Sequence, residues 1–322
     1  MTEFTGQKFA LFEGEIVPFE QAKVSVMTHA LNYGTGVFEG IRGYWNEERE
    51  ELYLLLLREH FQRFLKNTRM LLIDVPYSLD GLVDIAVDLV RRHSYRQDVY
   101  LRPLAYKSSE HIGVSMDGLD DAFTMFCIPY GDYVPMNRGL SVMVSSWKRS
   151  DDNAIPGRAK ATGNYINSAL AKNEAKSNGY DEAVFLNQLG YVCEVSAANI
   201  FLVRNNVLVT PSLADGILEG YTRDVVIKLA QDEFGIPTAQ RAVGRSELYY
   251  ADEIFLAGTG VQIAPVTSVD KRAVGNGEIG PIASSLQKMY FDVVKGRNPK
   301  YMDWLTPVGA PARTSAEPVH AR

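Results

Sequence analysis

The sequence has little cysteine. Cys127 and Cys193 are the only two in 322 residues, and they lie far apart without a nearby pair of histidines. This usage predicts neither a disulfide framework nor a zinc site, and it fits a reducing compartment. We therefore expect a cytoplasmic protein that holds no metal.

Long apolar runs and dense basic runs are also missing. The densest apolar run, Leu52 to Leu57, is far too short to cross a bilayer. The N-terminus lacks the basic start and apolar core of a secretory signal. The net charge is −6 without clustered Lys and Arg, so nucleic acid is not an expected partner. The sequence predicts a soluble protein that binds neither membranes nor nucleic acid.

What is present is ordinary globular material, with 46% hydrophobic and 22% charged residues. The length suggests about two domains, and strand patterns outnumber helical patterns in both, which predicts an α+β fold. The stretch PYGDYVPMNRG, dense in Pro, Gly and Asn, is typical of a linker. We expect a small N-terminal domain (1–129), an interdomain loop (130–138), a larger domain (139–308) and a disordered tail (309–322).

Strand and helix patterns alternate in the first domain. Hairpins are expected around Gly14 and the polar turn NEEREE, and Ser78 is a candidate helix N-cap. The expected strands are Phe9–Phe12, Glu15–Phe19, Val37–Trp45, Leu52–Leu57, Val99–Tyr106 and Ala122–Ile128, and the expected helices are Arg58–Leu72 and Leu79–Val90.

The second domain reads in the same way. Asn205-Asn206 is a hairpin-type turn, and Gly235-Ile-Pro237 is a helix stop signal. The expected strands are Leu140–Ser145, Glu182–Asn187, Tyr191–Val195, Asn199–Arg204, Val207–Pro211 and Glu253–Ala257, and the expected helices are Asn164–Ser177, Arg223–Phe234 and Ile282–Val294.

Lys160 stands in IPGRAKATGNY, a stretch rich in Gly and Ala just before a predicted helix. A solvated loop lysine is the plainer interpretation. Small neighbours would, however, let a planar ring approach the backbone closely. A lysine removed from water also loses its proton more easily, as a Schiff-base nucleophile must.

Glu194 lies inside an apolar strand, where side chains alternate between faces. It is either an exposed edge carboxylate or a partly buried one that needs a cationic partner, such as a protonated pyridine nitrogen.

Three segments could bind an anion. Thr222 is in N-cap position of a helix, Gly258-Thr259-Gly260 ends a strand in a turn whose amides could form a nest, and Arg58 at a strand-to-helix junction could add a bidentate grip. Simple capping, a tight turn and a surface ion pair are the alternatives.

Tyr100 and Arg102 are two residues apart on a predicted strand and therefore share a face. Such a pair could read a carboxylate, or it could be a structural cross-strand pair.

Eight segments in order, HALNYGTGVFEGIR, LREHFQR, YLRPL, MVSSW, AKATGNY, YVCEVSAANIF, LEGYTRD and GTGVQIAPV, resemble the motifs of branched-chain aminotransferases. These enzymes have fold type IV among the pyridoxal-phosphate enzymes. The resemblance covers roughly Phe9 to Leu305. It implies a smaller N-terminal α/β domain and a larger C-terminal pseudo-barrel domain.

The resemblance also implies roles for matching positions. Lys160 would form the aldimine with pyridoxal 5'-phosphate, and Glu194 would pair with the ring nitrogen. The phosphate would be held by Arg58, Thr222 and Thr259 with the amides of Tyr221 and Gly260, and Tyr165 would bond the phenolic oxygen. Substrate contacts would come from Tyr33, Phe38, Gly40, Tyr100, Arg102, Tyr133, Thr259 and Gly260, and from Ile112 and Val114 of a neighbouring subunit.

The implied activity is ping-pong transamination between L-leucine, L-isoleucine or L-valine and 2-oxoglutarate, by a homodimer or a larger homo-oligomer such as a hexamer. The chain also departs from the family pattern. Tyr221 stands where the family commonly has a small or β-branched apolar residue, and Glu219 stands where it often has Pro. Gly260-Val261-Gln262 replaces the usual Ala-containing turn and Ala-Glu. These departures leave two alternatives of the same fold, an (R)-amine or D-amino-acid transaminase and an aminodeoxychorismate lyase.

Overall fold

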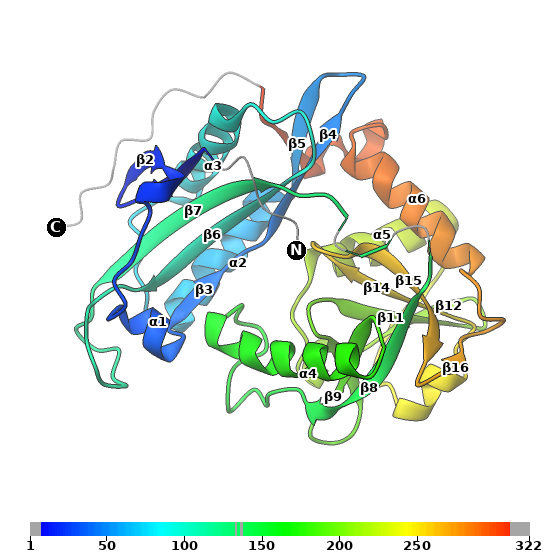
Figure 1. Ribbon diagram of the computed structural model, residues 1–322. Helices are drawn as coiled ribbons and strands as arrows, with labels where there is room; N and C mark the ends of the chain where they lie inside the picture. The colour runs from blue at the N-terminus through cyan, green and yellow to red at the C-terminus, as the bar shows by residue number, and fades with distance from the viewer. Residues whose placement is uncertain (1–7, 133, 136–137, 310–322) are drawn as a thin grey trace. The chain divides into compact units, whose positions relative to one another are not determined.

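The computed structural model describes residues 8–132, 134–135 and 138–309. Apart from those gaps, residues 8–131, 160–163 and 293–309 form unit 1, and residues 132–159 and 164–292 form unit 2 (Figure 1). The segment that begins at Lys160 thus belongs to unit 1. Part of the predicted interdomain loop, and the predicted tail after residue 309, lie outside the described residues.

Unit 1 is built on an antiparallel sheet. Its eight strands among the described residues have the order β17-β5-β4-β6-β7-β1-β2, with β3 paired to β6. The predicted hairpin around Gly14 is confirmed, with Phe12 opposite Glu15. The strands are β1 Phe9–Phe12, β2 Glu15–Pro18, β3 Gly36–Phe38, β4 Ile41–Asn46, β5 Glu51–Leu55, β6 Val99–Lys107, β7 Asp121–Pro129 and β17 Leu305–Pro307.

The single strand predicted over Val37–Trp45 is wrong, because the chain leaves the sheet at Glu39 and Gly40. β3 pairs with the second half of β6, and β4 pairs with its first half. The Glu39 amide donates to the carbonyl of Pro103 at 3.0 Å at the crossing. A Cβ on Gly40 would come within 2.3 Å of the Tyr100 hydroxyl, so a larger residue there would displace the Tyr100 ring.

Two long helices pack on this sheet and bury its core (Figure 1). They are α2 (Leu57–Met70) and α3 (Leu79–His93). The predicted N-cap is confirmed, since the Ser78 hydroxyl accepts from the Gly81 amide at 3.1 Å. A short helix, α1 (His29–Tyr33), was not predicted.

Unit 2 contains a mixed sheet. Its nine strands among the described residues have the order β10-β9-β8-β15-β14-β11-β12-β13, with β16 paired to β15. The predicted turn at Asn205 and Asn206 is confirmed, with φ of 51° and 60°. The strands are β8 Leu140–Lys148, β9 Glu182–Leu186, β10 Val192–Val195, β11 Asn199–Arg204, β12 Val207–Thr210, β13 Thr238–Gln240, β14 Glu253–Gly258, β15 Gln262–Val269 and β16 Arg272–Ala273.

Three α-helices within the described residues accompany this sheet. α4 (Tyr165–Ser177) packs on β8 and β9, and α5 (Tyr221–Phe234) packs on β14. α5 ends at Gly235 in the left-handed conformation, as predicted. The amides of Ile282 and Ala283 in the first turn of α6 (Pro281–Val294) donate to the Glu253 carboxylate at 3.0 and 2.8 Å. No helix in the described ranges is long and apolar enough to cross a membrane.

Candidate active site

Lys160 begins a short segment that is bound to unit 1. Its carbonyl accepts a hydrogen bond from the Phe38 amide at 3.1 Å. Two residues further on, the Thr162 hydroxyl donates to the carbonyl of Gly34 at 2.7 Å. A Cβ on Gly34 would lie 2.8 Å from the Cα of Gly163, so the two backbones touch. The small residues of AKATG therefore serve a close backbone approach that fixes the main chain at Lys160.

The amine of Lys160 faces an aromatic ring. Its Nζ lies 5.2 Å from the centroid of the Phe38 ring, and the Arg102 guanidinium carbon lies 4.2 Å from the same centroid. Arg102 donates from Nε and Nη2 to the Tyr100 hydroxyl at 3.1 and 2.7 Å. The prediction that Tyr100 and Arg102 share a strand face is confirmed. Five predicted residues therefore lie together in unit 1, since Gly40 lies against Tyr100. They are Lys160, Phe38, Gly40, Tyr100 and Arg102.

A buried ionic cluster, which the sequence analysis missed, lies beside these residues. Glu39 is fully buried, and its carboxylate accepts from Arg63 Nε at 2.7 Å, Arg63 Nη2 at 2.8 Å and His60 Nδ1 at 2.8 Å. The motif VFEGIR contains Glu39 between two predicted pocket residues. A charged residue inside an otherwise apolar strand pattern was the available signal.

Arg58 stands in the first turn of α2 with its side chain 51% exposed, and its Nη1 pairs with the Asp80 carboxylate of α3. This is a surface ion pair in the described structure. The phosphate-binding role of Arg58 stays a prediction.

Tyr33 and the loop that contains Ile112 and Val114 lie together. The Gly113 amide donates to the Tyr33 hydroxyl at 3.1 Å. The side chains of Ile112 and Val114 are exposed, that of Val114 by 84%. The predicted pocket residue Tyr133 lies outside the described residues.

Glu194 in β10 is buried, with 4% of its surface exposed, so the alternative of an exposed edge carboxylate is wrong. Its Oε1 accepts from Arg149 at 2.8 Å. Its Oε2 accepts from Asn199 Nδ2 at 3.2 Å and from the Leu218 amide at 3.1 Å. The predicted need for a cationic partner is therefore met within the protein by Arg149, which follows β8 and was not predicted.

Asn199 joins the predicted elements of unit 2. Its amide bonds Glu194, and it also donates to the carbonyl of Leu218 at 3.0 Å, two residues before the N-cap of α5. Its neighbour Ala198 packs on Gly258, where a Cβ would lie 3.0 Å from the Ala198 Cβ. The buried carboxylate, the N-terminus of α5 and the turn after β14 thus meet at the start of β11.

The N-cap of α5 is Gly220, so the prediction that Thr222 is in N-cap position is wrong by two residues. Gly220 has extended backbone angles, and a Cβ there would come within 2.1 Å of Asn199 Oδ1. Thr222 is instead buried in the first helical turn, beside Tyr221 at its start. No side chain of the described residues caps this helix, and its dipole favours an anion at this end.

The predicted turn after β14 is confirmed. Thr259 and Gly260 lie between β14 and β15, and Gly258 pairs with Gln262 across it. Gln262 is buried with φ of 59°, an unusual conformation for a residue other than glycine. Tyr165 begins α4 shortly after residues 160–163, which belong to unit 1, and its side chain is half-buried.

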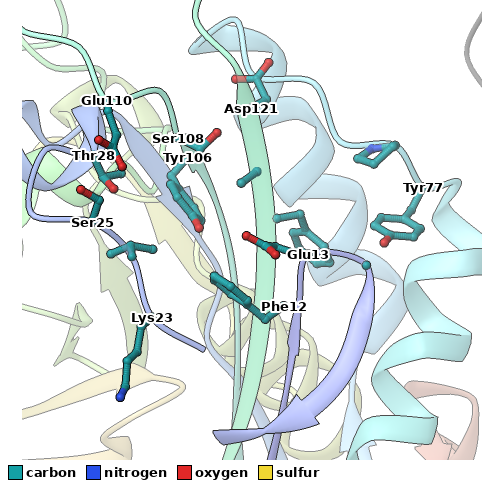
Figure 2. Close-up of a pocket in the computed structure, with 15 residues that line it drawn as sticks. Phe12, Glu13, Lys23, Ser25, Thr28, Tyr77, Tyr106, Ser108, Glu110 and Asp121 are labelled. Carbon is teal, nitrogen blue, oxygen red and sulfur yellow. The ribbon is translucent and has the colours of Figure 1, made fainter. Parts of the chain in front are cut away.

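A groove of about 630 Å³ lies elsewhere on unit 1. Figure 2 shows Phe12 and Glu13 of the β1–β2 hairpin facing Tyr106, with Ser25 and Glu110 beyond. The residues that line this groove in the described structure include none of the predicted site residues. It is therefore separate from the surroundings of Lys160.

The comparisons with known proteins agree with this arrangement. Residues 36–269 match the model of the family "Amino-transferase class IV". A probable branched-chain-amino-acid aminotransferase of Aquifex aeolicus is 48% identical over 300 residues, which are 93% of this chain and 96% of that relative. The chain therefore belongs to the class IV aminotransferases and, within them, to the branched-chain aminotransferases.

Solved structures support the same conclusion. The branched-chain aminotransferase of Thermoproteus uzoniensis with norvaline is 44% identical, with a TM-score of 0.90 over 94% of this chain and 100% of that one. The branched-chain amino acid aminotransferase of Thermobaculum terrenum in its PLP-form is 38% identical, with a TM-score of 0.91 over 95% and 99%. The predicted two-domain α+β fold of type IV is confirmed.

Proposed function

We propose that the protein transfers the amino group of L-leucine, L-isoleucine and L-valine to 2-oxoglutarate, with pyridoxal 5'-phosphate as cofactor. Its membership of the branched-chain aminotransferases supports the reaction. One observation carries the proposal: the Lys160 amine and the Arg102 guanidinium face the same Phe38 ring. A nucleophilic amine, an apolar surface and a carboxylate-binding cation are what an apolar amino acid and 2-oxoglutarate together require.

The residues of unit 2 fit the cofactor. The buried carboxylate of Glu194 suits the N–H of a protonated pyridine ring. The α5 N-terminus begins at Gly220, where a Cβ would displace the Asn199 side chain, and it suits a phosphate. Both are linked through Asn199. When bound, the cofactor supplies an electron sink for the substrate α-carbon.

We assign the cofactor contacts as follows. Lys160 makes the covalent linkage, and Glu194 holds the ring nitrogen. Tyr165 bonds the phenolic oxygen. The phosphate is bound by Arg58, Tyr221, Thr222, Thr259 and Gly260.

The substrate contacts follow the same proposal. Phe38, Gly40 and Tyr133 line the side-chain pocket, and Tyr100 with the Thr259 and Gly260 amides holds the α-carboxylate. The Arg102 guanidinium, oriented by its two hydrogen bonds to Tyr100, binds the distal carboxylate of 2-oxoglutarate together with Tyr33.

The chain's own chemistry is proton handling. Nζ of Lys160 would move the proton between the substrate α-carbon and C4′ of the cofactor, acting first as general base and then as general acid. Glu194 stays ionised beside Arg149 and thereby keeps a proton on the ring nitrogen. The amino group would stay with the cofactor-loaded enzyme when the first 2-oxo acid leaves, so that donor and acceptor bind in turn, which gives ping-pong kinetics.

We further propose a cytoplasmic homodimer, which could assemble further into a hexamer. The exposed apolar side chains of Ile112 and Val114 support an interface at their loop. Because the Gly113 amide bonds the Tyr33 hydroxyl of the same chain, a loop presented to a neighbouring subunit would bring Tyr33 with it. Size-exclusion chromatography with light scattering measures the oligomeric state, and a monomer with full activity would contradict this part.

A substrate panel tests the function. With 2-oxoglutarate as acceptor, L-leucine, L-isoleucine and L-valine should give glutamate at rates well above D-alanine and (R)-1-phenylethylamine. Faster turnover of the D- or (R)-donors would instead establish the transaminase alternative. Aromatic amine formed from aminodeoxychorismate without any acceptor would establish the lyase.

A further inference from the structure

Glu39, His60 and Arg63 form a closed ionic cluster inside unit 1. All three side chains are at least nine-tenths buried. Arg63 grips both carboxylate oxygens of Glu39, at 2.7 and 2.8 Å, and His60 adds a third bond at 2.8 Å. Three charge-assisted bonds at these lengths are strong and directional, so they hold the carboxylate in one position.

The cluster is anchored to the backbone that carries Lys160. Glu39 follows Phe38 directly, and the Phe38 amide donates to the Lys160 carbonyl at 3.1 Å. The Glu39 amide in turn donates to the Pro103 carbonyl at 3.0 Å, beside Arg102 in β6. A shift of the Glu39 carboxylate would therefore move Phe38 and the main chain at Lys160 together.

The net charge of the cluster is zero. Burial alone would raise the pKa of the Glu39 carboxyl, but the charge of Arg63 and the hydrogen bonds from His60 and Arg63 hold that pKa far below its ordinary value. Burial lowers the pKa of His60, against the hydrogen bond and charge of Glu39, which raise it; the charges of Arg63 and Lys160 act in the same direction as burial, and the pKa stays below its ordinary value. At neutral pH the cluster is thus a carboxylate, a guanidinium and a neutral imidazole.

This neutrality matters for Lys160, because a buried charge close to an amine changes its proton affinity. An uncompensated carboxylate at Glu39 would hold the proton on Lys160, and an uncompensated guanidinium at Arg63 would drive it off. The charged and titratable groups of unit 1 around Phe38 and Lys160 include these three side chains, Arg102 and Tyr100.

We propose that Glu39, His60 and Arg63 act together as a positioning cluster that fixes Phe38 and the Lys160 backbone and adds no net charge to the surroundings of Lys160. The inference rests on the proposed cofactor linkage to Lys160. It assigns no catalytic contact to the three residues, since they act through Phe38 and Lys160.

The test removes the two charges separately. In the holoenzyme, the pH midpoint of the visible absorbance of the lysine-bound cofactor should fall by about one unit in Glu39→Gln and rise by about one unit in Arg63→Gln. The double variant should return close to the wild-type midpoint. His60→Asn keeps a neutral donor near the Nδ1 position, so it should leave the midpoint unchanged. Arg241→Gln, which opens an exposed ion pair of unit 2, is the control.

A merely structural cluster would lower stability in both single variants without shifting the midpoint in opposite directions, and that result would overturn the inference. A shift in His60→Asn would overturn the neutral state of the cluster. If a charge-removing variant does not fold, Glu39→Asp tests positioning. The shorter side chain keeps the negative charge but places the carboxylate one methylene further from Arg63 and His60. It should lower kcat about tenfold or more at an unchanged midpoint, and an unchanged kcat would contradict the inference.

Failure of the proposed function gives a different result. If Lys160 does not bind the cofactor, chemical reduction of the wild-type holoenzyme will not label Lys160. If only the cluster inference fails, the wild type is labelled at Lys160 and the midpoints of the variants do not diverge.

Discussion

Two buried carboxylates of this protein have similar burial but different surroundings. Glu39 in unit 1 receives its three bonds from two side chains of one helix, α2. Glu194 in unit 2 receives bonds from Arg149, from the Asn199 side chain and from the Leu218 amide. These partners come from three parts of the chain: Arg149 follows β8, Asn199 starts β11, and Leu218 lies shortly before the N-terminus of α5. Burial with an arginine partner is therefore common to both carboxylates. What distinguishes Glu194, the proposed cofactor contact, is its link to the N-terminus of α5.

Removing each carboxylate in turn is the strongest way to break this comparison. Glu39→Ala leaves Arg63 buried without its partner and should cost about 3–5 kcal/mol of unfolding free energy. Glu194→Gln also removes the charge opposite the buried Arg149, but its amide oxygen can still accept from Asn199 and the Leu218 amide, so it should lose less stability than Glu39→Ala, while kcat falls about a hundredfold or more. Urea denaturation of the apoenzymes and steady-state kinetics of the holoenzymes measure the two effects. Equal stability loss with equal activity loss would remove the distinction.

Gly220→Ala sharpens the comparison on the side of unit 2. The new Cβ would meet Asn199 Oδ1 at 2.1 Å and displace a side chain that bonds Glu194. We expect cofactor affinity to fall about tenfold, in the range seen when a supporting hydrogen bond is removed. Gly244→Ala is the matched control, since its Cβ would meet only Glu247 at 3.9 Å. Equilibrium titration of the apoenzymes with cofactor measures both; equal affinities would contradict the coupling.

Arg102→Gln addresses the side of unit 1. It removes the charge over the Phe38 ring and weakens the grip on Tyr100. The KM for 2-oxoglutarate should rise about tenfold or more, and the KM for L-leucine should change less, because leucine has no distal carboxylate. Equal increases for both substrates would mean that Arg102 supports the pocket without reading the second carboxylate.

The smallest effect concerns pH. Burial lowers the pKa of His60 and of His93 in the folded protein below the ordinary value of 6.5. As the pH falls below about 6.5, the unfolded chain takes up protons that the folded chain does not, so the unfolding free energy should decrease on acidification. His60→Asn should flatten this decrease. Urea denaturation at pH 7.5 and 5.5 decides it, and a wild type that is more stable at pH 5.5 would disagree with both shifts.

Much of the fold could be predicted from local patterns. The hairpins around Gly14 and Asn205, the Ser78 cap and the helix stop at Gly235 each depend on a few neighbouring residues. The break at Gly40 could not be predicted, because it depends on the Tyr100 hydroxyl of another strand. β15 was missed because Pro265 lies inside it, and a proline argues against an interior strand.

The site divides in the same way. Lys160, Tyr100 and Arg102 were predicted, since motif and strand alternation are local signals. The partners of the two carboxylates were not. Arg149 reaches Glu194 only because β8, β9 and β10 lie side by side in one sheet. Arg63 reaches Glu39 only because α2 packs on β3. Such tertiary pairings leave no trace in local spacing.

The most direct test of the account is the identity of the lysine that carries the cofactor. The wild-type holoenzyme is reduced with borohydride, digested with trypsin and analysed by mass spectrometry. A modified Lys160 resists trypsin, so we expect the added mass on the peptide of residues 159–172. The added mass on a peptide that contains another lysine, with an unmodified cleavage after Lys160, would contradict the central claim.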